Sequence, residues 1–199
     1  MNHERRRSAT YGARWVAIAS IMSALALVGN YSLVAVPNVE LGTTVLFITS
    51  TSFGLPMGIW CTLIMSVIFG TINPWGPFVP QIWITQVIGW AYVAVAGGLV
   101  RRIDRPAGTT YRASRDLFIV GLFVTAMFDS ISNIGYSLAF SVPYSIAMIA
   151  GLPFMAAHVL SNGVLFSLVI PRVESIIGKE FGPALWSGTV ERLEVLGEE

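Results

Sequence analysis

The sequence has almost no charge over its first half. Between Trp15 and Val100 the only acidic or basic side chain is Glu40, and the run from Leu41 to Val100 has none. A soluble domain needs charged or densely polar side chains on its surface, so this apolar stretch belongs in hydrocarbon. The composition agrees, with 54% hydrophobic residues, 12% charged residues and a mean hydropathy of +0.69. We therefore expect an integral membrane protein that contacts the lipid bilayer.

Several chemical motifs are also missing. The single cysteine, Cys61, excludes an internal disulfide. There is no Gly-x-x-x-x-Gly-Lys-Ser/Thr phosphate loop, no His-Glu-x-x-His, no Gly-x-Ser-x-Gly and no Cys/His cluster for a structural metal. We therefore expect no enzyme, no cofactor and no metal, and ATP hydrolysis cannot be assigned to this chain. A net charge of +1 gives no indication of nucleic-acid binding.

The positive charges mark the cytoplasmic side. All twelve Lys and Arg residues lie outside the apolar segments or at their edges, in three clusters: Arg5, Arg6, Arg7 and Arg14; Arg101, Arg102, Arg105, Arg112 and Arg115; Arg172, Lys179 and Arg192. Cytoplasmic loops carry an excess of Lys and Arg, so each cluster is expected inside.

The number of membrane crossings follows from length and parity. The apolar blocks are Trp15–Val36, Thr43–Ile72, Ile82–Val100, Leu117–Phe140 and Ser145–Ile170. As one helix the second block would reach about 45 Å, beyond a hydrocarbon core of roughly 30 Å, so it should break near its centre, where Gly and Pro residues lie. If that block crossed once, one of the first two basic clusters would lie outside, whereas two crossings put both clusters inside.

We therefore predict an all-α membrane protein, a bundle of six transmembrane helices with cytoplasmic N- and C-termini in the cell membrane. The second and third helices should be short and joined by a tight turn at Gly54–Gly58. A re-entrant pair satisfies the parity equally well. The domain is expected to span residues 1–172, with 173–199 as a short cytoplasmic tail.

Three loops then lie outside, and two have an unusual composition. None of the segments Val36–Gly42, Ile72–Pro80 and Phe140–Tyr144 contains Lys or Arg. The second carries Asn73-Pro74-Trp75-Gly76-Pro77, a stiff run of the kind that shapes a binding surface. We expect Asn73 and Trp75 to contact a ligand, with Trp75 stacking on a ring.

The outer loops and the helix that follows resemble a known family. The run with Pro37-Asn38-Val39-Glu40, Asn73-Pro74-Trp75-Gly76-Pro77 and Gln81 to Gln86-Val87-Ile88-Gly89 resembles the substrate-binding S components of energy-coupling factor (ECF) vitamin transporters, most closely the cobalamin-type branch. The resemblance implies six helices, an outward vitamin site and, as partners, a transmembrane coupling subunit and two ATPase subunits. It also implies that the polar residues of this run bind substrate: Asn38, Glu40, Asn73, Trp75, Gln81 and Gln86.

The same resemblance implies a docking face on the first helix. Family members carry small residues there that pack against the coupling subunit, and small residues four apart let helix backbones approach closely. Ala13 and Ala17 have this spacing here, with Ser20 and Ala24 as rival candidates. Such spacing also arises by chance in an Ala-rich helix.

Asp129 is the only acid within an apolar segment away from the membrane edge. An intramembrane carboxylate is costly unless it is paired, protonated or wetted. Asn133 and Tyr136 follow at helical spacing, so this stripe should line a cavity. Counting about 1.5 Å per residue from the preceding loop puts Asp129 and His158 at similar depth, so the two side chains could meet. That contact could equally serve only to fasten two helices.

Glu40 and Asn38 also have two readings. They lie just before the second helix, where a carboxylate favours the positive helix end and Asn38 could cap free N–H groups. The same side chains would face a ligand in an outward cavity, and the two roles are compatible.

The function expected from the sequence is a membrane-embedded subunit that captures a vitamin or related micronutrient, such as cobalamin, for an ATP-driven importer. The rival is a self-sufficient proton-coupled carrier or channel that uses Asp129 and His158 as a relay. An intramembrane enzyme ranks last, because no nucleophile, base and orienting group occur together.

Overall fold

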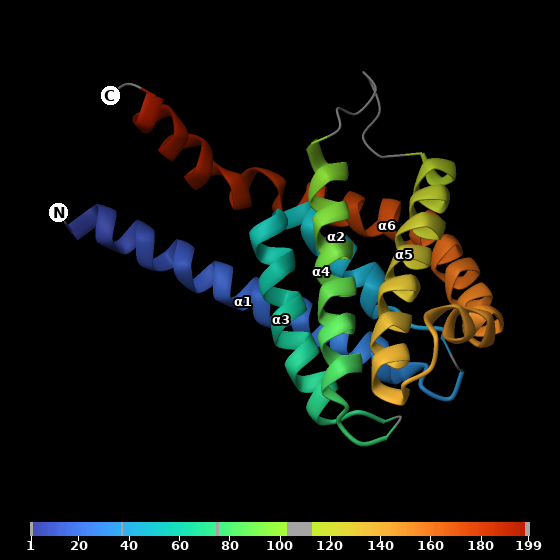
Figure 1. The fold of residues 1–199 in the computed structure, drawn as a ribbon. Helices are drawn as coiled ribbons and strands as arrows, with labels where there is room; N and C mark the ends of the chain where they lie inside the picture. Colours follow the sequence, from blue (N-terminus) through green and yellow to red (C-terminus); the bar gives the residue numbers. More distant parts are fainter. Residues whose placement is uncertain (1, 37, 75, 103–112, 198–199) are drawn as a thin grey trace.

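The computed structural model of the chain consists of α-helices (Figure 1). It describes residues 2–36, 38–74, 76–102 and 113–197, and within these ranges the side chains from 12 to 179. The described part contains no strand, and its six helices are α1 (Asn2–Ser32), α2 (Gly42–Phe53), α3 (Leu55–Thr71), α4 (Pro80–Arg102), α5 (Ser114–Phe140) and α6 (Tyr144–Gly197). The predicted all-α fold of six helices is confirmed.

Four of the helices are long and apolar enough to cross a membrane. The spans are Gly12–Ser32, Pro80–Arg102, Ser114–Phe140 and Tyr144–Lys179. The other two helices, α2 with 12 residues and α3 with 17, reach only about 18 and 26 Å, less than the roughly 30 Å of a hydrocarbon core. The fold is thus consistent with a membrane protein, in which α2 and α3 form a shorter pair.

The predicted break in the second apolar block lies at Gly54. This residue has φ 96°, a conformation that favours glycine, and it separates α2 from α3. Pro56 lies in the first turn of α3, where its missing N–H is no loss. The turn is therefore shorter than the predicted Gly54–Gly58. Gly58 is already helical, and its small size serves packing, because a Cβ there would collide with the side chain of Ser50.

Successive helices run in opposite directions. Near one end of the bundle, the Tyr31 hydroxyl of α1 donates a hydrogen bond to the carbonyl of Ile72 after α3, at 2.6 Å. At the other end, Arg101 of α4 donates through Nη1 to the carbonyl of Ser52 in α2, at 2.8 Å. The loops that precede α2, α4 and α6 lie together at the lower end in Figure 1, and α1 and α6 both project to its left. This common end is where the sequence analysis expects the outer loops.

The core surrounds α2. This helix contacts α1, α3, α4 and α6, and nine of its residues are buried: Gly42, Thr43, Thr44, Leu46, Phe47, Ile48, Thr49, Ser50 and Thr51. The Phe47 ring lies 4.7 Å from that of Phe166 on α6. Because α2 is packed on several sides by protein, its hydroxyl groups do not face lipid, and this explains why so polar a helix is tolerated.

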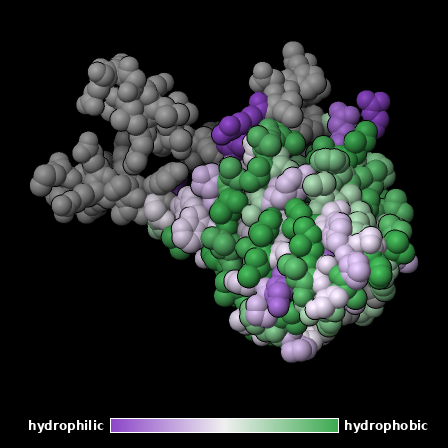
Figure 2. Space-filling model, viewed as in Figure 1, coloured by the Kyte–Doolittle hydropathy of each residue, from purple (hydrophilic) through white to green (hydrophobic). Residues whose placement is uncertain are grey.

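The outer surface is mostly apolar. Figure 2 shows hydrophobic side chains over much of the visible face of the bundle, with the most hydrophilic atoms at its upper edge and a smaller hydrophilic group on the lower part of the face. Large exposed apolar side chains occur on every helix except α2, for example Ile21, Trp60, Ile88, Phe123 and Leu160. A soluble monomer rarely exposes so continuous an apolar surface, whereas lipid tails cover it at no loss.

Helix α6 runs through the expected boundary between domain and tail. Helix α6 has 54 residues and continues past Arg172 to Gly197 without interruption. The predicted division between a domain at 1–172 and a tail at 173–199 therefore does not coincide with a break in the helix.

Candidate functional site

A pocket of about 490 Å³ lies among the helices, next to the loop that joins α1 to α2. Its polar lining comes from that loop and from α1, α4, α5 and α6: Asn30, Asn38, Glu40, Gln86, Asp129, Ser132, Asn133, Tyr136 and His158. Its apolar lining includes Phe69, Trp90, Phe128, Phe154 and Met155. Ligand pockets of small molecules have this size and this mixture of apolar walls with a few polar groups.

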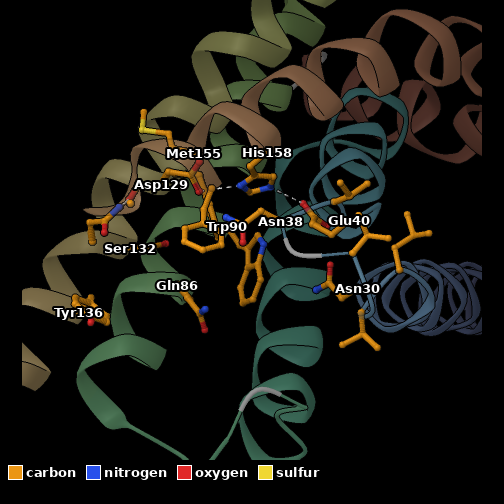
Figure 3. A pocket seen from close by; sticks show the side chains of 18 of the residues that line it. Asn30, Asn38, Glu40, Gln86, Trp90, Asp129, Ser132, Tyr136, Met155 and His158 are labelled. Atoms are coloured by element: carbon orange, nitrogen blue, oxygen red, sulfur yellow. Dashed lines mark hydrogen bonds and ion pairs between the residues drawn. The ribbon is translucent and has the colours of Figure 1, made fainter. Parts of the chain in front are cut away.

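The centre of the site is a row of three ionisable side chains, Glu40, His158 and Asp129, which we call the acid–histidine triad. His158 Nδ1 lies 2.8 Å from Asp129 Oδ1, and His158 Nε2 lies 3.3 Å from Glu40 Oε1. The three side chains are 17%, 6% and 8% exposed in the order Glu40, His158 and Asp129. Figure 3 shows the imidazole between the two carboxylates, above the ring of Trp90. The predicted contact between Asp129 and His158 is present.

Helical spacing positions most of the polar groups. Asn133 lies one turn after Asp129 on α5, and its Nδ2 donates to the Asp129 carbonyl at 2.9 Å. Asn162 lies one turn after His158 on α6, and its Nδ2 donates to Glu40 Oε1 at 3.5 Å. The triad therefore joins α5, α6 and the loop before α2 at one level of the bundle.

Glu40 caps α2, and Asn38 does not. The amide of Thr43 in the first turn of α2 donates to Glu40 Oε2 at 2.9 Å, so the carboxylate satisfies a free N–H at the positive helix end. Asn38 instead has a left-handed backbone with φ 58° and lines the pocket. Glu40 therefore both caps α2 and lines the pocket. The capping role considered for Asn38 is wrong.

The triad carries a net negative charge. Each of its two hydrogen bonds needs one proton, so the ring is an imidazolium between two carboxylates, or a neutral imidazole beside one protonated carboxyl group. The net charge is −1 in both cases when Asp129 Oδ2 carries no further proton, and the pocket lining described above includes no Lys or Arg. Burial opposes ionisation of Glu40, but the hydrogen bonds and charge of His158 and the bonds from Thr43 hold its pKa below the usual value.

Some polar atoms in the pocket wall have no partner within the described part of the chain. They are Asn30 Oδ1, Asp129 Oδ2, Trp90 Nε1 and Ser132 Oγ. Asp129 and Trp90 are only 6% and 4% exposed. A buried donor or acceptor without a partner costs about 1–3 kcal/mol, so a ligand that reached one of these atoms and bonded to it would remove that cost.

Aromatic rings form one wall of the pocket. The Phe69 ring meets Trp90 edge-on at 5.6 Å, Trp90 lies 5.5 Å from Phe128, and Phe128 lies edge-on to His158 at 5.8 Å. These contacts hold the indole and the imidazole in fixed orientations, because each ring is restrained by the next.

The pocket brings together six of the nine substrate-binding residues that the sequence predicted: Asn38, Glu40, Gln86, Asp129, Asn133 and Tyr136. Asn73 and Gln81 do not line it, and Trp75 lies outside the described residues. The sequence did not place Asn30, Phe69 or His158 at a substrate site, although His158 appeared as a partner of Asp129.

The four candidate docking residues share the outer face of α1. Ala13, Ala17, Ser20 and Ala24 are all exposed, whereas the buried side of the helix contains Ala19, Met22, Ser23 and Ala26. The small residues therefore face away from the bundle and are available to another helix.

Comparisons with protein-family models, curated proteins and solved structures find no match to this chain. Within the described residues no group of three His, Cys, Asp or Glu side chains is arranged to hold a metal ion. In the triad itself both imidazole nitrogens already face carboxylates.

Proposed function

We propose that this chain is the substrate-binding subunit of an ATP-driven membrane importer of the ECF type. The observation that carries the proposal is the pocket, because it combines aromatic walls with buried polar atoms that have no partner among the described residues. These features are typical of a ligand-binding site. A catalytic site would pair a nucleophile with a base, and the described lining of the pocket has no such pair. The outer loops at the same end of the bundle lack Lys and Arg, which fits a pocket that opens to the outside.

The proposed partners are a transmembrane coupling subunit and two ATPase subunits. The chain has no phosphate-binding loop, so energy for accumulation has to come from elsewhere. The exposed face of α1, with small residues at Ala13, Ala17, Ser20 and Ala24, offers a surface where a partner helix could approach closely. An Ala17→Trp variant should reduce copurification of the coupling subunit, while Val16→Trp at a neighbouring exposed position should not.

The proposed topology has six crossings, cytoplasmic termini and a location in the cell membrane. In a Cys61→Ser background, single cysteines at Gly76 and Ala113 should react oppositely with a membrane-impermeant thiol reagent in intact cells. Gly76 precedes α4 and Ala113 precedes α5, and both are exposed. Equal labelling would overturn the parity argument.

The proposed substrate is a vitamin or related micronutrient. The volume of about 490 Å³ favours a compound of a few hundred daltons. A complete cobalamin molecule has far more atoms than this pocket encloses, so the pocket favours a smaller substrate than the cobalamin-type resemblance implied.

Mass spectrometry of small molecules that copurify with the protein in detergent tests the proposal directly. We expect one vitamin-like compound that is retained by the wild type and lost in an Asp129→Asn variant. An Asp116→Asn variant provides the matched control, because Asp116 lies on the same helix but is exposed and outside the pocket. Uptake by cells should then require the coupling and ATPase subunits and should survive a protonophore.

The second candidate function is a self-sufficient proton-coupled carrier. It is favoured by the triad, in which one imidazole bridges two buried carboxylates and thus joins three proton-binding groups. Uptake by the chain alone, abolished by a protonophore, would support this alternative and exclude the importer subunit.

A further inference from the structure

The acid–histidine triad and the unpartnered atoms beside it define what the pocket should bind. This inference rests on the proposed function, because it takes the pocket as a substrate site. Neither the charge of the triad nor the donor and acceptor pattern of the wall depends on the identity of a transporter family.

The first constraint on the ligand is charge. The triad holds a net −1 charge in a buried position, and the polar wall that surrounds it offers no Lys or Arg in the described pocket lining. Hydrocarbon around the bundle makes an uncompensated charge costly. A cationic ligand would neutralise the site, whereas an anionic ligand would add a second negative charge next to the first.

The second constraint is the hydrogen-bonding pattern. Asp129 Oδ1 faces His158, but Oδ2 has no partner in the described chain and can only accept unless it carries a proton. Trp90 Nε1 can only donate and is also without a partner. The ligand therefore needs an N–H or O–H donor for Asp129 and an acceptor atom for Trp90.

The third constraint is shape. Phe69, Trp90, Phe128 and Phe154 give the pocket aromatic walls, and Tyr136 on α5 adds another ring. Aromatic faces attract both flat rings and cations. A long aliphatic cation would compensate the negative charge of the triad but would not offer a flat ring to pack against these aromatic side chains.

We propose that the pocket selects a positively charged ring compound, an aromatic or heteroaromatic ring with a cationic N–H donor that reaches Asp129. The ring packs against the aromatic wall near Trp90. A ring acceptor atom receives the indole N–H, and the cationic group compensates the charge of the triad.

The test uses a matched series in which the ring stays constant and only the charge changes: benzamidine, benzamide and benzoate. The amidinium group is flat, cationic and able to donate two hydrogen bonds to a carboxylate. Binding is measured on the purified full-length chain in detergent as a rise in the unfolding midpoint with increasing probe. The buried Cys61 reports unfolding through its reaction with a fluorogenic maleimide, since it is the only cysteine.

We expect benzamidine to stabilise the protein at a concentration about tenfold lower than benzamide, in line with a hydrogen bond to a charged group, and benzoate to have no effect. The Asp129→Asn variant should lose the preference for benzamidine, while the Asp116→Asn control should retain it. Equal stabilisation by benzamidine and benzamide, preferential binding of benzoate, or no stabilisation by any probe would overturn the proposal.

The order of stabilisation by benzamidine, benzamide and benzoate on the wild-type protein tests the proposed ligand charge even if Asp129→Asn does not fold. In that case Trp90→Phe serves as the second variant: benzamidine has no acceptor for the indole N–H, so its preference over benzoate should survive this change, and loss of that preference would overturn the proposal. The result is also independent of the importer test. A preference for benzamidine without ATP-dependent uptake would refute the importer function alone, and ATP-dependent uptake without this preference would refute the substrate class alone.

Discussion

Replacement of His158 by alanine is expected to destabilise the protein strongly. The variant removes the donor that faces Asp129 Oδ1 at 2.8 Å and Glu40 Oε1 at 3.3 Å. Removing one partner of a buried ion pair costs about 3–5 kcal/mol, because the remaining charge is left buried. Single hydrogen bonds between membrane helices contribute less, on average about 0.6 kcal/mol, since the unfolded chain in the membrane finds other partners.

The structure decides between these magnitudes. Glu40 would keep its bonds from the Thr43 amide and Asn162 Nδ2, whereas Asp129 would have no described partner on either oxygen. The penalty therefore falls mainly on one carboxylate, and we expect a loss of about 3 kcal/mol, the lower end of the range for a buried ion pair. For a chain of this size that loss lowers the unfolding midpoint by about 6–12 °C.

The assay is maleimide labelling of Cys61 during heating, with Leu160→Ala as the control. Leu160 lies on the same helix as His158 but is exposed and does not line the pocket, so its truncation should change the midpoint little. Adding Asp129→Asn to His158→Ala should restore about 1–2 kcal/mol, because a neutral amide is less costly to bury than an unpaired carboxylate. A loss below about 1 kcal/mol for His158→Ala, or additive losses in the double variant, would refute the charge argument.

Two further predictions concern the ligand wall and the helix packing. Trp90→Phe should weaken binding of the copurified ligand by about 1 kcal/mol or more in calorimetry, because it removes a buried donor that has no partner among the described residues. Trp60→Phe on the exposed face should leave the affinity unchanged. Equal affinities in both variants would exclude Trp90 Nε1 from the site. Gly135→Ala should lower the unfolding midpoint by the equivalent of about 1–3 kcal/mol, since its Cβ would approach the Gln81 carbonyl to 2.6 Å. The control Gly12→Ala places its Cβ near no other atom and should leave the midpoint unchanged. Equal midpoints for the two variants would refute the close contact of α4 with α5.

The sequence predicted the helices well because the membrane simplifies the problem. Hydrocarbon requires every backbone polar group to bond within its own segment, so long apolar blocks become helices. The overlong block Thr43–Ile72 broke where Gly and Pro allowed it, at Gly54. The exact turn was not predictable, because Gly58 has no distinctive local signature and its role depends on Ser50 in the neighbouring helix.

The site was predictable where helical spacing and rarity coincide. Asp129 stood out as an intramembrane acid, and spacing placed Asn133 and Tyr136 on its stripe; all three line the pocket. His158 was found as a partner of Asp129 by counting depth, but its second contact, to Glu40, joins residues 118 positions apart and leaves no local trace. The signal for it lies in the composition. Glu40, Asp129 and His158 are ionisable residues in apolar surroundings with few other charges nearby in the sequence, so they are natural partners for one another.

The aromatic residues show the limit of this reasoning more clearly. Trp75 was favoured because a stiff loop suggested a binding surface, while Trp90 was one of several helix tryptophans with no distinguishing pattern. What distinguishes Trp90 is tertiary: Phe69 and Phe128 hold its ring at the pocket, and no described acceptor receives its Nε1–H. Neither fact follows from spacing along one helix.

The two roles considered for Asp129, fastening helices and binding substrate, fall on different oxygens. Oδ1 receives His158 and joins α5 to α6, while Oδ2 has no partner within the described part of the chain. A ligand donor on Oδ2 need not break the bond that fixes the carboxylate, so the helix contact orients the binding group before the ligand arrives, and less ordering is needed on binding. The bond from His158 to Glu40 extends the same restraint to the loop before α2, whose residues form another wall of the pocket. A change of charge at any member of the triad is therefore expected to alter the shape of the site as well as its charge.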